Sequence, residues 1–128
     1  MSEQLFTCAP SGAWEPDFTL VHVGLNAEDM SSADAIARAF AGLFQWDTRA
    51  TPNSVFSGEA VEAMAGCGRG EHGHIGIGTH NIQAAVAWMR ERGVEFLEET
   101  FVKNQFGKYG AIYLKQQIGG FAVHLVEL

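Results

Sequence analysis

Three histidines and one glutamate occupy matching places in two stretches of the chain. His22 lies in the segment VHVGL and His74 in GHIGIG, whereas Glu62 and His124 lie in GEAVE and GFAVH. Imidazole nitrogens and a carboxylate together form a donor set that suits Zn, Ni, Co, Fe or Mn in proteins. These four residues are therefore candidate ligands of one divalent transition metal ion.

The matching places recur because the chain reads as an internal repeat. Residues 18–66 and 73–128 each follow the order strand, helix, strand, strand, strand. The predicted strands cover 18–25, 48–51, 54–58 and 61–64 in the first module, and 73–79, 94–101, 111–115 and 120–127 in the second. In this register the first two histidines are equivalent, and the glutamate is equivalent to the last histidine.

One amphipathic helix is predicted in each module. The first helix is expected to be capped by Ser31 or Ser32. The second starts after Asn81 and stops at Gly93. The apolar residues that recur at helical spacing are Ala33, Ile36, Ala37, Phe40 and Phe44 in the first helix and Ile82, Ala85, Val86 and Met89 in the second. Both helices need an apolar sheet face to cover.

Strand alternation places the candidate ligands on the face that the helices do not cover. In each strand, side chains two residues apart point to the same side. The apolar face is expected to consist of Val23, Leu25, Ile75, Ile77, Val123 and Leu125, while the ligands have small neighbours such as Gly24 and Gly76. We therefore expect an α+β fold whose mixed sheet curls into a cupped, partly open barrel around the four ligands, with helices outside.

At these residues the sequence resembles the vicinal oxygen chelate superfamily, which includes glyoxalase I, extradiol dioxygenases and bleomycin-resistance proteins. The resemblance covers residues 18–128 and is strongest at VHVGL, GHIGIG and the ending GGFAVHLVEL. It implies metal ligands on the first, fourth, fifth and eighth strands, which are His22, Glu62, His74 and His124. The family most often has Glu at the last position, so His124 removes one candidate carboxylate base.

The resemblance also implies a reaction type. The family uses its metal to hold two neighbouring substrate oxygens and to stabilise an enediolate-like anion, as in glyoxalase-type lyases, isomerases or dioxygenases. Glu62 would be an anionic ligand or a general base, and a small 2-oxo acid or hydroxy-carbonyl metabolite is the expected substrate. Family members commonly form homodimers. The ending AIYLK…IGGFAVHLVEL is also similar to a small domain associated with 2-keto-3-deoxy-6-phosphogluconate aldolases.

Further residues are candidates for contact with the substrate, although each also fits an ordinary structural role. They are Met64 and Phe56, Tyr113, and the loop residues Lys103 and Tyr109. Glu59 is the alternative carboxylate if the strand register slips by one hairpin, and His72 shares the alternation of His74. A metal-free binding module of the same fold, or an accessory module of an aldolase, is the competing interpretation.

The composition excludes several partners. The net charge is -7 and only eight Lys and Arg are present, so neither nucleic acid nor an anionic membrane is an expected partner. Two cysteines in unlike contexts do not form a disulfide framework, which favours a reduced, cytoplasmic setting. Residues 1–17 are predicted to form an N-terminal arm, followed by a single domain over 18–128.

Overall fold

The computed structural model describes residues 14–66, 68–103 and 109–128. Along these residues the chain forms β1 (Thr19–Ala27), α1 (Met30–Phe44), β2 (Thr48–Ala50), β3 (Ser54–Ser57), β4 (Val61–Ala65), β5 (Gly73–Thr79), α2 (Ile82–Glu91), β6 (Phe96–Lys103), β7 (Tyr109–Leu114) and β8 (Phe121–Glu127). The order strand, helix and three strands thus occurs twice, as the sequence predicted. Most of the predicted arm lies outside the described residues.

The eight strands form one mixed sheet in the order β2-β3-β4-β1-β5-β8-β7-β6. The β1–β4 pair is parallel, whereas β2–β3, β3–β4, β6–β7 and β7–β8 are antiparallel. The sheet is not closed into a full barrel. The α+β class and the open mixed sheet predicted from the sequence are confirmed.

The start of α1 differs from the prediction. Asp29 is the N-cap, in extended backbone, and its side chain accepts a hydrogen bond of 2.8 Å from the Ser32 backbone N–H. Ser31 and Ser32, the predicted caps, therefore lie inside the first turn. The helix ends at Gln45, which adopts a left-handed backbone conformation with φ 60° although it is not a glycine. That conformation is disfavoured for a residue with a Cβ atom.

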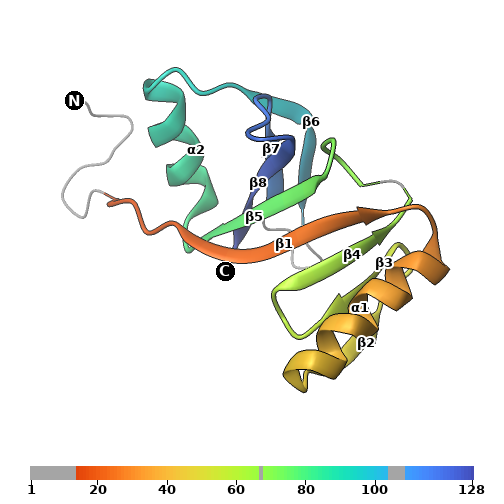
Figure 1. Cartoon of the computed structure of the whole chain (residues 1–128). Coiled ribbons are helices and arrows are strands. Elements are labelled where there is room, and N and C mark those ends of the chain that lie inside the picture. Colours follow the sequence, from red (N-terminus) through yellow and green to blue (C-terminus); the bar gives the residue numbers. More distant parts are fainter. Residues whose placement is uncertain (1–13, 67, 104–108) are drawn as a thin grey trace. The chain divides into compact units, whose positions relative to one another are not determined.

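The chain divides into two compact units, and one of them spans residues 20–76 and 117–123. In this unit α1 packs against β3 and β4 (Figure 1). Ala33 and Ala37 of the helix contact the cross-strand pair Val55 and Ala63, and all four are buried. Because small residues line both sides, the helix can approach the sheet closely. Val23 and Leu25, expected under a helix, are only half-buried.

The other unit comprises the described residues of the ranges 14–19, 77–116 and 124–128. Its buried apolar residues include Ile82, Ala85 and Val86 of α2, Phe96 of β6, and the cross-strand pair Ile112 and Leu125. Asn81 caps α2 as predicted, accepting a hydrogen bond of 3.1 Å from the Ala84 backbone N–H. The Glu127 carboxylate accepts another from the Ile82 N–H at 2.8 Å.

The boundaries of the last strands differ from the predicted ones. β6 runs over Phe96–Lys103 rather than 94–101, and an irregular register between Leu97 and Val102 extends its pairing with β7. β7 begins at Tyr109, inside the stretch that was predicted to be a loop. No helix among the described residues is long and apolar enough to cross a membrane.

Candidate metal centre

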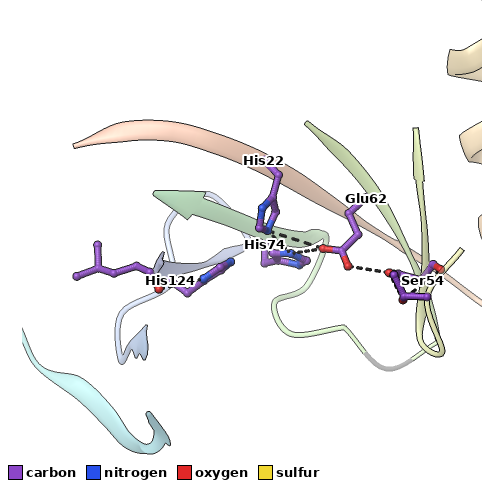
Figure 2. Close-up of polar contacts among 7 residues, drawn as sticks. His22, Ser54, Glu62, His74 and His124 are labelled. Carbon is purple, nitrogen blue, oxygen red and sulfur yellow. Dashed lines mark hydrogen bonds and ion pairs between the residues drawn. The ribbon is translucent and has the colours of Figure 1, made fainter. Parts of the chain in front are cut away.

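Three of the four predicted ligands come together from three strands. His22 lies on β1, Glu62 on β4 and His74 on β5 (Figure 2). The Nε2 atoms of the two histidines are 3.1 Å apart, and Glu62 Oε1 lies 3.1 Å from His74 Nε2 and 3.7 Å from His22 Nε2. An ionised carboxylate only accepts hydrogen bonds, so the hydrogen between them is on His74 Nε2 here. A metal ion bound at that atom would take its place, with the ring hydrogen on Nδ1 instead.

Gly24 provides the space in which the His74 ring lies. It is opposite Glu62 in the parallel β1–β4 pair, and it shares the strand face of His22. A Cβ atom at position 24 would lie 2.0 Å from His74 Cε1, closer than any real contact. Glycine is therefore required here by the close approach of the imidazole. The sequence analysis identified this residue only as a small neighbour of the ligands.

The separations among the three donor atoms fit a transition metal ion. A circle through points 3.1, 3.1 and 3.7 Å apart has a radius of about 1.9 Å. Metal–nitrogen and metal–oxygen bonds of about 2.0–2.2 Å are slightly longer. His22, Glu62 and His74 are therefore spaced so that they could hold one such ion. Two imidazoles and one carboxylate on one side of an ion leave further coordination positions open.

The other oxygen of Glu62 accepts a hydrogen bond from Ser54, which is in turn bonded to Thr51. Ser54 donates a hydrogen bond of 2.7 Å to Glu62 Oε2, and its side chain is buried. Its Oγ also lies 2.7 Å from Thr51 Oγ1. Ser54 has one hydroxyl hydrogen, which goes to the carboxylate, so Thr51 must be the donor in the second bond. This chain of hydrogen bonds fixes which way Glu62 presents Oε1.

Sequence reasoning missed Ser54 and Thr51 as site residues. The β3–β4 pairing contained a signal, because Phe56 is directly opposite Glu62 and Ser54 is directly opposite Met64. Residues at these positions share one face of the hairpin, so Ser54 is diagonal to Glu62. Finding it required the hairpin register, which the sequence alone did not supply.

The environment favours neutral imidazole and ionised carboxylate. Burial and the neighbouring His74 lower the pKa of His22, against a smaller opposing effect of Glu62. Burial acts to raise the pKa of Glu62, but hydrogen bonds from His74 and Ser54 and the nearby imidazoles outweigh it, so that this pKa lies below its ordinary value. A neutral His22 keeps a lone pair for a metal ion, and an ionised Glu62 supplies negative charge.

Two predicted lining residues lie beside this cluster. Phe56 of β3 presents its ring edge-on to His22, with ring centres 6.2 Å apart. Met64 of β4 lies two residues beyond Glu62 on the same strand face, opposite Asn26 in the parallel pair. Glu59, the alternative carboxylate, is exposed in the turn before β4.

The remaining predicted residues belong to the other compact unit. His124 of β8 is buried, its Nδ1 is 3.3 Å from the Leu125 carbonyl oxygen, and its ring centre is 5.0 Å from that of Tyr113. Tyr113 is its direct cross-strand neighbour on β7. Lys103 is exposed at the end of β6. The side chain of Tyr109 lies outside the described residues. These assignments stay predictions.

No family model matches the sequence, and no curated protein matches it. Among solved structures, the chain is similar to hypothetical protein BH1468 from Bacillus halodurans C-125, with 17% identity over 88% of this chain and 96% of that one and a TM-score of 0.61. It is also similar to a methylmalonyl-CoA epimerase in selenomethionine form, with 20% identity over 98% of both chains and a TM-score of 0.59. A methylmalonyl-CoA epimerase in complex with methylmalonyl-CoA and NH4+ has 17% identity over 84% of this chain and 92% of that one, with a TM-score of 0.58. These likenesses show a shared α+β, glyoxalase-like fold.

Proposed function

We propose that this chain is a metal-dependent enzyme of the vicinal oxygen chelate superfamily. In this proposal His22, Glu62, His74 and His124 hold a divalent transition metal ion, which is Zn, Ni, Co, Fe or Mn. The observation that carries it is the convergence of His22, Glu62 and His74, whose donor atoms are 3.1–3.7 Å apart. The internal repeat makes His124 the equivalent of Glu62.

The proposed substrate is a small 2-oxo or hydroxy-carbonyl metabolite. A bound divalent cation supplies Lewis acidity, which polarises a carbonyl oxygen and stabilises an enediolate-type anion. The structural neighbours named epimerases act on methylmalonyl-CoA. Inverting a carbon next to a carbonyl group requires removal and return of its proton, which belongs to the same class of chemistry. The likeness of fold supports this class of chemistry. The identity of the substrate depends on the residues of the site.

Glu62 has the central role among the protein groups. Its Oε2 is engaged by Ser54, and its Oε1 points to the two imidazoles. It is therefore either the anionic ligand or the base that accepts the substrate proton at Oε1. The lowered pKa of Glu62 favours the ligand role, because a weakly basic carboxylate removes a carbon-bound proton poorly.

The convergence of His22, Glu62 and His74 also fits a second candidate function, a non-catalytic module that binds a small molecule. In that case His74→Ala would leave binding of the small molecule intact. Two other predictions rest on sequence resemblance alone: homodimer formation, and association with a sugar-acid aldolase. Gel filtration of the purified protein checks the first, and co-purification with such an enzyme checks the second.

Metal analysis of purified protein tests the proposed site. After supplementation with each candidate metal and removal of the excess, we expect close to one equivalent in the wild-type protein. His74→Ala and Glu62→Ala should each lower the affinity strongly, because both remove a ligand. Less than about 0.1 equivalent of every metal in folded wild-type protein would overturn the metal proposal.

A proton-exchange experiment separates the enzyme from the binding module. Metal-loaded protein is incubated in D2O with short 2-oxo acids, and the hydrogen on the carbon next to the carbonyl is followed by proton NMR. An enzyme of the proposed class accelerates loss of this signal, and the metal-free protein and His74→Ala do not. Equal exchange rates in all three samples would support the non-catalytic alternative.

A further inference from the structure

A row of cross-strand neighbours leads from the candidate ligands to the strand at the end of the sheet order. Arg49 of β2 is directly opposite Phe56 of β3, Phe56 is opposite Glu62 of β4, and Glu62 is opposite Gly24 of β1. Residues opposite each other in adjacent strands project from the same face of a sheet. Arg49 is therefore on the ligand face, two strands away from Glu62.

The side chain of Arg49 is directed along this row. Its guanidinium carbon lies 4.4 Å from the centre of the Phe56 ring, in a cation–π contact. The same ring is edge-on to His22 at 6.2 Å between centres. The guanidinium carbon is consequently no farther than about 10.6 Å from the centre of the His22 ring. A small molecule bound to the metal site through two oxygens could reach it with a short chain.

Arg49 also keeps its charge available. Among the residues that the structure describes, it has no carboxylate within ion-pair distance. By contrast, Arg38, Arg90 and Lys115 are paired with Asp34, Glu98 and Glu95. The chain has fifteen acidic residues and a net charge of -7, so such a guanidinium is uncommon in it. The planar donor fork of arginine matches carboxylate and phosphate groups.

We propose that Arg49 binds a second anionic group of the substrate, a carboxylate or a phosphate, separated by a few bonds from the two oxygens held at the metal. This inference rests on the proposed function, because it needs a ligand anchored at the His22–Glu62–His74 cluster. It narrows the substrate class from any small hydroxy-carbonyl compound to one with an anionic tail. Phe56 positions the guanidinium and separates it from the imidazoles.

Three hydroxamates with the same metal-binding head group test the inference on metal-loaded protein. Acetohydroxamate is neutral beyond the head group, succinic acid monohydroxamate has a carboxylate tail, and the phosphonate analogue has a phosphonate in its place. Their affinities are measured by calorimetry for wild-type protein, Arg49→Met and Arg38→Met. Methionine preserves apolar cover over Phe56 while removing the charge, and Arg38 is an exposed control on α1.

We expect wild-type protein to prefer an anionic tail about two- to fivefold, as a solvent-exposed charge pair allows. The preference should disappear in Arg49→Met, persist in Arg38→Met, and shrink with added salt. The stronger of the two anionic probes identifies the group. Equal affinities for neutral and anionic probes in wild-type protein, or an unchanged preference in Arg49→Met, would overturn the inference and leave the metal site standing. Failure of all three probes to bind would overturn both proposals.

Discussion

The hydrogen bond from Ser54 to Glu62 permits a quantitative test of the proposed metal centre. Ser54→Ala removes the donor that holds Glu62 Oε2 at 2.7 Å. The methyl group of alanine occupies nearly the same space, so the surrounding strands keep their packing. The carboxylate loses a partner and gains freedom to rotate away from the two imidazoles. Thr51 can still donate to the backbone carbonyl oxygen of residue 54, at 3.3 Å.

The expected magnitude follows from the charge on the acceptor. A hydrogen bond to an ionised group contributes about 1.5–3 kcal/mol. If that contribution orients a metal ligand, its loss lowers metal affinity roughly 10- to 100-fold, which is also the usual effect of removing a group that orients a ligand. Ser54 is only 1% exposed, so water cannot readily replace its hydroxyl group.

Ser57→Ala is the matched control. Ser57 lies on the same strand, is 0% exposed, and its Oγ has no hydrogen-bond partner among the described residues. It alternates with Phe56 and therefore faces away from Glu62. Its replacement should change metal affinity by less than about twofold. Both variants lose one buried hydroxyl group from β3, so a general effect of such a loss would appear in both.

The assay is competition for the metal with a chelator of known affinity, at constant pH and with circular dichroism to verify folding. A Ser54→Ala protein that is folded and binds metal as tightly as wild type would refute the reasoning. So would an equal loss in Ser54→Ala and Ser57→Ala, because it would show that the hydroxyl group at position 54 acts through strand packing rather than through Glu62.

Three other predictions concern neighbouring features. Gly24→Ala should lower metal affinity by about tenfold or more in the same competition assay, since the new Cβ would lie 2.0 Å from His74 Cε1; unchanged affinity would contradict the need for glycine. Gln45→Gly should raise the free energy of unfolding by about 1 kcal/mol in urea, because glycine adopts φ 60° without strain, and a loss of stability would contradict this. The lowered pKa of His22 means that, as the pH falls, the unfolded chain binds a proton before the folded one. Urea unfolding of metal-free protein should therefore show stability declining between about pH 7 and pH 5, and a flat profile would contradict the assignment.

The fold was predictable because apolar periodicity changes clearly between strands and helices. The segment 73–79 was predicted with both of its ends correct, since glycines and a histidine interrupt its apolar pattern in strict alternation. The predicted start of α1 was wrong because Asp29, Ser31 and Ser32 can all act as caps. Which of them caps the helix depends on which residue adopts the extended backbone conformation. The predicted end of β6 was wrong because the irregular pairing near Val102 depends on the neighbouring strand and cannot be recognised from the local sequence.

The candidate site was partly predictable for a related reason. His22, Glu62 and His74 are residue types with few ordinary roles on a strand, and the internal repeat gave their positions meaning. Ser54 has a common residue type, and its contribution depends on being diagonal to Glu62 in the hairpin. Arg49 was missed because its link to the ligands passes through two strand pairings. Such relationships follow from register, which the sequence pattern does not specify between strands.

The contrast between β2 and the buried strands bears on how this protein could diversify. All three residues of β2 are exposed, and substitutions at such positions usually change stability by no more than about 0.5 kcal/mol. The candidate ligands are confined by Gly24 and Ser54 and tolerate little change. If Arg49 binds the substrate as proposed, evolution, or a laboratory library restricted to positions 48–50, would change which molecules bind and leave the candidate ligands in place.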